Sequence, residues 1–304
     1  MFMARRERSA SHPSARTASG RKAQDRKALW RSTLERRYDF HLGEAIRAGL
    51  QGSHDKAAGH SGQALLISRE LCADTADTAR HQPELAAALC AHARYGGGTW
   101  QAIAMLAESA GHYAVLAEAD PAAYEVPRID VLTRIALASD AAGSTLEAIT
   151  LLQEVVGMYL KAPAADQEER DLGLARARFH LGCCLLKAGM AEDGLAETEA
   201  GLELAGDVLD RLQMGFAARD WLVEAPRYLQ LAAPDWAAAA VRSMTLHEEA
   251  GRWPQAASAA RAAIGVSGGL AELGGDTLRD AHEKISVRAE EILARAKHPG
   301  TVGR

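Results

Sequence analysis

The sequence is poor in aromatic residues and lacks the short motifs that mark common catalytic and nucleotide-binding sites. Phe, Trp and Tyr together make up 5% of its 304 residues. The patterns GxxxxGK[ST] and HExxH do not occur, and no strand followed by GxGxxG can be assigned. Each of these patterns supplies a phosphate-binding loop or metal ligands. The sequence therefore favours a protein that is not an enzyme and needs no cofactor.

Long apolar segments are also missing. No apolar run approaches the roughly 18 residues that span a bilayer, and the charged N-terminus is not followed by the apolar core of a secretory signal. The four cysteines form no CxxC pair; they are Cys72, Cys90, Cys183 and Cys184. We therefore predict no membrane contact, free thiols and a cytoplasmic location.

Strand patterns are a third absence. Val, Ile and aromatic residues are scattered, and they do not alternate with polar residues between turn residues. Hydrophobic residues still make up 48% of the chain, and most of them are Ala and Leu. Small side chains let helices approach closely, so the composition predicts an all-α fold.

Positive charge is concentrated at the N-terminus. Residues 1–37 contain eleven Lys and Arg against three Asp and Glu, a net charge of +8, so the overall charge of −5 leaves −13 on residues 38–304. Residues 1–23 have almost nothing to bury and are predicted to be a disordered basic tail. The segment 1–37 suits weak contact with nucleic-acid phosphates, or it is a solvated tail without that role.

A helix, a tight turn and a second helix are predicted over Ile129–Val156. Apolar residues recur with a helical period up to Ala142 and again after Ser144, with Gly143 between them. Glycine accepts the positive φ of such a turn. Ser144 is followed three residues later by a glutamate, which is the spacing of a capping box and places the start of the second helix.

The same outline recurs along the chain. Gly97, Gly143 and Gly189 are each 46 residues apart, and Gly251 follows 62 residues later. Small residues recur in phase five residues after these glycines and, in three copies, seven residues before them. They are Ala102, Ala148, Gly194 and Ala256, and Cys90, Ala136 and Gly182. Two helices cross closely only where neither carries a bulky side chain, so the pattern predicts stacked helix pairs.

The N-terminal part is assigned to a degenerate first repeat or cap over residues 24–80. Its first helix has an apolar stripe from Leu29 to Leu50. A break at 51–60 contains two glycines, and a second helix is predicted at 63–79.

The repeats are assigned to residues 81–266. Pro83 is expected in the first turn of a helix, and Asp120–Pro127 is expected to link two units. Residues 206–232 supply an inserted helix, because the last glycine spacing is longer than the others. A C-terminal capping helix is predicted at 275–297.

The helix–glycine–helix units with small crossing residues resemble tetratricopeptide repeats over about residues 60–266. The 46-residue spacing and the long second helix LEAITLLQEVVGMYL are similar to the elongated tandem repeats of regulatory proteins from high-GC bacteria. The resemblance implies a right-handed α-solenoid of antiparallel helix pairs, with a peptide or protein partner bound in a concave groove. Ala87 and Ala91 stand at matching groove positions where some members clamp a C-terminal carboxylate with polar residues, so that mode is not expected.

Five basic residues fall on the predicted first helices of the pairs: Arg94, Arg134, Arg176, Lys187 and Arg242. If they face inward they form a basic lining in an acidic protein, which suits an acidic segment of a partner. Tyr95 and Phe179 are candidate anchors, because aromatic residues dominate interface hot spots. The alternatives are a salt-bridged face, since acidic residues share these helices, and core packing for Phe179.

No metal site or nucleophile is predicted. Cys183 and Cys184 point about 100° apart on a helix, which suits packing better than chelation. His41, His54 and His60 lack the HxxxH spacing of a zinc site and are interpreted as surface residues.

The sequence thus favours a scaffold or regulatory adaptor that binds a peptide or protein partner. Two alternatives stay open. One is a nucleic-acid-associated regulator that uses the basic N-terminus. The other is a sensor whose groove, or irregular segment 206–260, binds a small ligand or a signalling peptide.

Overall fold

The structure, a computed structural model, describes residues 15–73, 78–96, 98–211, 240–273 and 276–297. The helices are α1 (Ala15–Leu50), α2 (His54–Cys72), α3 (Thr78–Tyr95), α4 (Thr99–Ala119), α5 (Pro121–Ala141), α6 (Thr145–Tyr159), α7 (Gln167–Lys187), α8 (Ala191–Arg211), α11 (Trp253–Leu273) and α12 (Asp276–Lys297). Residues 240–249 are also helical. These ranges contain no strand, which confirms the predicted all-α class.

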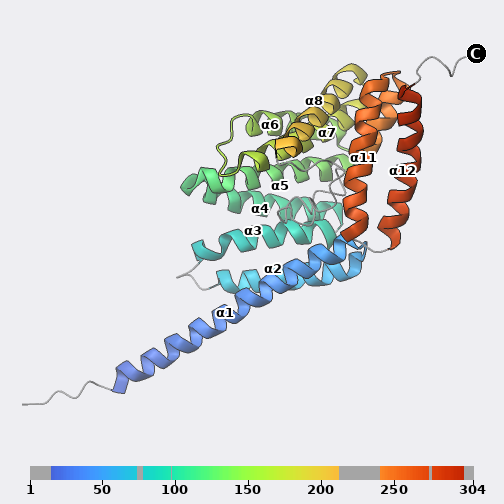
Figure 1. Cartoon of the computed structure of the whole chain (residues 1–304). Coiled ribbons are helices and arrows are strands. Elements are labelled where there is room, and N and C mark those ends of the chain that lie inside the picture. The colour runs from blue at the N-terminus through green and yellow to red at the C-terminus, as the bar shows by residue number, and fades with distance from the viewer. Residues whose placement is uncertain (1–14, 74–77, 97, 212–239, 274–275, 298–304) are drawn as a thin grey trace, which may run out of the picture.

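Neighbouring helices pack against one another in series. Each helix from α1 to α8 packs on the next one along the chain, and α11 packs on α12. Figure 1 shows α3, α4 and α5 lying one above another, while α11 and α12 stand upright along one side. Because α11 contacts both α8 and α1, the first helix and the last helices meet. This arrangement is compatible with the predicted helical repeat.

Glycines with positive φ form the tight turns. Gly143, Gly189 and Gly251 have φ angles of +94°, +84° and +68°, which confirms the turn role predicted for them. Gly97 lies outside the described residues. Gly52, with a φ of +70°, forms a further turn and stands 45 residues before Gly97 in the sequence. The glycine register therefore begins one unit earlier than the sequence analysis placed it.

The four turns share one hydrogen-bond pattern. In each, the amide of the residue after the glycine donates to the carbonyl five residues back, as in a Schellman motif. The donor–acceptor pairs are Ser53–Ala48 (2.8 Å), Ser144–Ser139 (2.9 Å), Met190–Leu185 (2.9 Å) and Arg252–His247 (2.8 Å). The same local geometry thus ends four different helices.

Small residues stand where paired helices cross, as predicted. An added Cβ at Gly182 on α7 would lie 2.6 Å from the carbonyl oxygen of Gly194 on α8, and one at Gly194 would lie 2.9 Å from the oxygen of Gly182. In the pair α5 and α6, Ala136 and Ala148 are fully buried. The crossings bring backbone against backbone and leave no room for a larger side chain.

Side-chain contacts between alternate helices have the separation of the sequence period. They are Tyr38 Oη donating to Glu84 O (2.9 Å), Lys187 Nζ donating to Asp140 Oδ1 (2.7 Å) and Arg295 donating to Glu248 Oε1 (2.8 Å), which are 46, 47 and 47 residues apart. The period read from the glycines is therefore also a period of packing. By this measure α12 relates to residues 240–249 as α7 relates to α5.

The predicted apolar stripe of α1 is buried only in its C-terminal part. Leu34, Tyr38 and Ile46 are buried against α2 and α3. Leu29, the first residue of the predicted stripe, is 67% exposed, so the buried stripe begins later than predicted. The N-terminal part of α1 therefore extends beyond the helices that pack on its C-terminal part.

Two predicted boundaries in the N-terminal region are corrected. α2 begins at His54, so the break predicted at 51–60 contains only residues 51–53. Pro83 lies inside α3, which begins at Thr78, and not in its first turn. In both cases the helix begins earlier than predicted.

The link predicted between Asp120 and Pro127 is helical. Pro121 opens α5, Pro127 lies inside it, and Asp120 caps it by accepting from Ala123 N at 3.2 Å. α6 begins after Ser144 as predicted, but the Ser144 side chain makes no capping hydrogen bond. The capping box is therefore wrong although the boundary is right.

Other predicted segments can be placed on these helices. Residues 15–23, assigned to the basic tail, form the first part of α1, and residues 206–211 of the predicted insertion end α8. Residues 212–239 of the predicted insertion and repeats lie outside the described residues. Within the described ranges, no helix combines the length and the apolar character that crossing a bilayer requires.

The turn at Gly143 gives a first test. We expect Gly143→Ala to lower the free energy of unfolding by about 1 kcal/mol, because alanine is strained at positive φ. Gly157→Ala is the matched control, since Gly157 lies inside α6 and an added Cβ there meets nothing within 4 Å. The control should gain up to about 1 kcal/mol from helix propensity. Thermal and denaturant unfolding measure both, and equal effects would contradict the turn assignment.

His247 predicts a loss of stability in acid. It is fully buried, and neither ring nitrogen has a hydrogen-bond partner among the described residues. Burial lowers its pKa below the usual value, which Glu199 opposes and Arg252 reinforces. The unfolded chain therefore takes up a proton below about pH 6.5 that the folded protein does not.

We expect the stability of the wild type to fall from pH 7 to pH 5 more steeply than that of His247→Leu. The difference should stay below about 1.4 kcal/mol per pH unit, the limit for one proton. Denaturant unfolding at several pH values measures it. Burial also lowers the pKa of His92. Its contribution to the loss of stability in acid is therefore present in both the wild type and His247→Leu. Parallel pH profiles would show that His247 is not the group responsible.

Candidate functional site

A hollow of about 370 Å³ opens where the last turns of α3 and α5 approach each other. We name it the Arg94–Arg134 hollow. Its lining also includes the start of α2 and the first half of α4, and it consists of His54, Cys90, Ala93, Arg94, Tyr95, Ala102, Leu106, Arg134, Leu137 and Ala138. Three of the seven residues predicted for partner binding therefore share one surface feature.

The turns between helices bring these side chains together. Arg94 and Tyr95 end α3, and His54 begins α2 directly after the turn at Gly52. Tyr95 packs on Gly49 of α1, where an added Cβ would overlap its ring. The glycine at that point lets the tyrosine lie flat against α1 and fixes one wall of the hollow.

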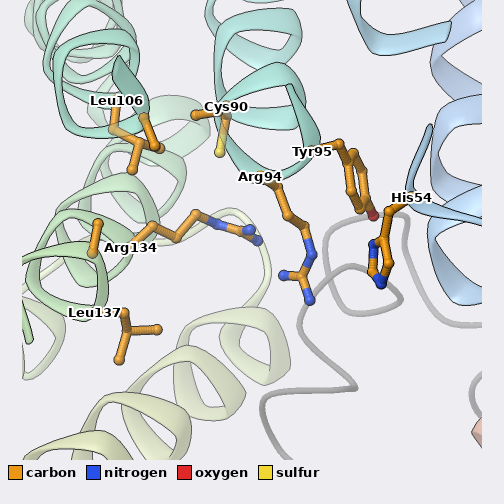
Figure 2. A pocket seen from close by; sticks show the side chains of 10 residues that line it. His54, Cys90, Arg94, Tyr95, Leu106, Arg134 and Leu137 are labelled. Carbon is orange, nitrogen blue, oxygen red and sulfur yellow. The ribbon is translucent and has the colours of Figure 1, made fainter. Parts of the chain in front are cut away.

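The hollow combines cationic groups with an apolar side. Figure 2 shows the guanidinium groups of Arg94 and Arg134 directed into the same space, with Tyr95 and His54 beside Arg94. Arg94 Cζ lies 5.9 Å from the centre of the Tyr95 ring, a cation–π contact that orients the guanidinium group. Leu106 and the α5 side chains supply the apolar surface.

Arg134 is held by a buried carboxylate that also binds Arg176. Its Nε donates to Asp130 Oδ2 at 2.9 Å, one turn earlier on α5. Arg176, on α7, donates to the other oxygen, Asp130 Oδ1. The side chains of Arg176 and Asp130 are only 4% and 13% exposed. One carboxylate thus neutralises one of two buried cations, and the cluster of these three side chains carries a net charge of +1.

Lys187 and Arg242 gather at a second carboxylate, Asp140. Lys187 Nζ and Thr145 Oγ1 donate to Asp140 Oδ1 at 2.7 and 2.6 Å. Burial raises the pKa of Asp140, but these hydrogen bonds and the charge of Arg242 outweigh burial, so its pKa is below the usual value. This group is therefore an ion-pair cluster between units, separate from the hollow.

Phe179 belongs neither to the hollow nor to the cluster around Asp140. It is 2% exposed and belongs to the core formed with Ala240, Met244 and α11 and α12. That is the packing role which the sequence analysis weighed against partner contact.

The thiols next to Asp140 are not reactive groups. Burial raises the pKa of Cys183 to about 11 and that of Cys184 to about 12, so both stay protonated at neutral pH. Nδ1 of His41 and Nδ1 of His60 lie 3.0 Å apart between α1 and α2, a contact that the sequence did not reveal. No group of three His, Cys, Asp or Glu side chains within the described ranges is arranged to hold a metal ion.

Sequence reasoning missed two residues that shape the site. His54 was interpreted as a surface residue near a loop, although it stands two residues after Gly52, a member of the glycine register. Recognising Gly52 as a turn would have placed His54 beside the end of α3. Asp130 was noted only as a charge near Arg134, because its second contact, with Arg176, is 46 residues away.

The arrangement suits binding of an anion. Two guanidinium groups present planar forks of N–H donors, which match a carboxylate or a phosphate. The apolar side chains in the lining lower the local dielectric constant, which strengthens such contacts.

The chain was compared with known protein families and with curated proteins. No protein-family model matches it, and no curated protein matches it.

The Asp130 cluster gives a test of stability. We expect Asp130→Asn to lower the free energy of unfolding by about 3 kcal/mol, because it leaves two buried arginines without their shared carboxylate. Asp280→Asn, at an exposed position on α12, is the control and should change stability by less than about 0.5 kcal/mol. Chemical unfolding measures both variants. Similar small changes would mean that the cluster does not hold α5 to α7.

Proposed function

We propose that this protein is an interaction module that holds an acidic segment of a peptide or protein partner in the Arg94–Arg134 hollow. The observation that supports this most directly is the convergence of two guanidinium groups, from α3 and α5, on a partly apolar hollow. A scaffold or regulatory adaptor in the cytoplasm is the role that such a module would serve. In this proposal it binds its partner without catalysing a reaction.

The proposed architecture is a right-handed α-solenoid of antiparallel helix pairs, similar to tetratricopeptide repeats. The shared turn motif and the side-chain contacts at 46 and 47 residues support it. In such an array the first helix of each pair lines the inner surface. α3 and α5 are these helices in two successive units, so the hollow would open on the inner face.

The size of the hollow limits what enters it. A volume of about 370 Å³ is at the small end of the range for ligand pockets, so it admits one or two side chains of a partner. The partner would therefore present an extended segment or a helix end. Contacts outside the hollow would have to supply the rest of the binding energy.

Charge favours an acidic segment. Arg94 and Arg134 contribute two positive charges at the hollow, and Asp130 offsets one of them at its edge. Arg176, Lys187 and Arg242 add positive charge along the neighbouring first helices, where they are already engaged with Asp130 and Asp140. Such a field speeds association with an acidic partner and disfavours a basic one.

The test is selection of ligands from a random peptide library on the immobilised protein. We expect enriched peptides to contain Asp or Glu next to an apolar residue. Arg94→Glu should weaken the selected peptides by about tenfold or more, because a like charge replaces an attractive one. Fluorescence anisotropy with labelled peptides measures the affinity.

Arg261→Glu is the matched control, since it makes the same change at an exposed position on α11. It should leave the affinity within about twofold of the wild type, a loss small on the scale of interface hot spots. Enrichment of peptides without acidic residues, or equal losses in both variants, would overturn the proposal.

A further inference from the structure

α1 projects from the rest of the molecule. It is 36 residues long. Among its side chains from residue 26 onward, residues 26–30 are all exposed and the first buried residue is Leu34. Figure 1 shows its N-terminal half running away from the other helices. At 1.5 Å per residue, the part from residue 15 to residue 33 extends roughly 28 Å. We name residues 15–33 the projecting half.

The projecting half is strongly cationic. Its six basic residues and one acidic residue, Asp25, give a net charge of +5. The basic residues are Arg16, Arg21, Lys22, Arg26, Lys27 and Arg31. At 100° per residue their positions are spread around the whole helix and do not form one face.

We propose that the projecting half of α1 docks on duplex DNA and that phosphates are its main ligands. An α-helix with side chains is about 10–12 Å across, and the major groove of B-form DNA is about 12 Å wide. Phosphates line both sides of that groove, so cationic side chains on different faces of the helix can contact phosphates at the same time. This interaction is independent of the proposed peptide hollow.

The distribution of apolar residues favours DNA over a membrane surface. A helix that lies on a membrane needs a continuous apolar face. Leu29 and Trp30 are exposed, but as neighbours in sequence they point about 100° apart, and the rest of the projecting half is Ala, Gly or polar. An anionic lipid surface would meet cationic side chains on one face only.

Because the rest of the molecule is acidic, DNA binding requires that the basic helix project away from it. Residues 38–304 carry a net charge of −13, which repels a polyanion at short range. Electrostatic repulsion decays over about 8 Å at physiological salt. The projecting half is roughly 28 Å long, so DNA bound along it would lie for the most part outside that range.

Binding should also affect the helix itself. Lys22 and Arg26, and Lys27 and Arg31, are pairs of like charge four residues apart on the projecting half. Such pairs are destabilising in isolated helices. Neutralisation by phosphates removes this repulsion, so helix content should rise when DNA binds.

The experiment measures fluorescence anisotropy of a labelled duplex DNA of mixed sequence with the full chain, over a series of salt concentrations. The variant Arg26→Gln/Lys27→Gln/Arg31→Gln removes three charges, of which two are at exposed positions and one is half-buried. We expect its affinity to fall at least tenfold near 0.1 M salt. Its plot of log K against log salt should become shallower by about 3, close to the release of one counterion per charge lost.

The matched control removes two arginines and one lysine from exposed positions on α11 and α12, as Arg261→Gln/Arg279→Gln/Lys284→Gln. It should bind as the wild type does, and Arg26→Lys/Arg31→Lys should also retain binding. Circular dichroism should show more helix on adding DNA. Absence of wild-type binding at about 50 mM salt would overturn the proposal, because phosphate contacts are strongest at low salt.

Three other results would overturn it as well. The first is equal affinity of the wild type and the variant lacking Arg26, Lys27 and Arg31. The second is equal binding of duplex RNA, whose narrow major groove does not admit a helix. The third is preferential binding to vesicles of phosphatidylserine and phosphatidylcholine, which would assign the helix to a lipid surface.

Discussion

The closeness with which paired helices cross is the constraint on which the rest of the structure depends. At Gly182 and Gly194 backbone meets backbone, and an added Cβ would lie within 3 Å of a carbonyl oxygen on either side. Such a crossing needs small residues on both helices, and the short connection between them needs a residue that accepts positive φ. The turns at Gly143 and Gly189, with the same hydrogen bonds, meet that need. Once one pair is fixed in this way, its remaining apolar surface can be covered by the next pair, so the spacing of packing follows the spacing of sequence.

Charged residues then join one unit to the next. Asp140 accepts from Lys187, and Glu248 accepts from Arg295, each across 47 residues. The buried carboxylate of Asp130 joins α5 to α7 through Arg176. A buried ion pair is not a large source of net stability, because desolvation offsets much of the attraction. Its geometric demands are strict, however, and a shift of one helix turn would leave a buried charge without its partner. We infer that these pairs select the register of stacking, while the Ala-rich core supplies the free energy.

The sequence predicted the parts of the structure that depend on local chemistry. The all-α class, the turns at Gly143, Gly189 and Gly251 and the small crossing residues follow from helix period, positive φ and side-chain volume, which a single segment displays. Errors arose where tertiary packing overrides a local signal. Pro83 and Pro127 lie inside helices because the lost hydrogen bond is outweighed by packing of the same helix elsewhere. Leu29 has the correct period but no helix opposite it. The hollow could not be predicted, since it depends on which side chains from different units meet.

The hollow lies where the ion pair that joins other units is replaced by different residues. Counted from the turn glycines, Arg94 stands at the position that Asp140 and Glu248 hold in their own units. Those two acids bind a cation 47 residues further along, and the residue 47 beyond Arg94 is Ala141, which has no polar side chain. An arginine therefore replaces the acid, and an alanine replaces its cationic partner. At this level the structure has a hollow lined by Arg94 and Arg134. The hollow thus coincides with two differences between the units, at residues 94 and 141, while the glycine turns that end these helices keep the same geometry at residues 143, 189 and 251.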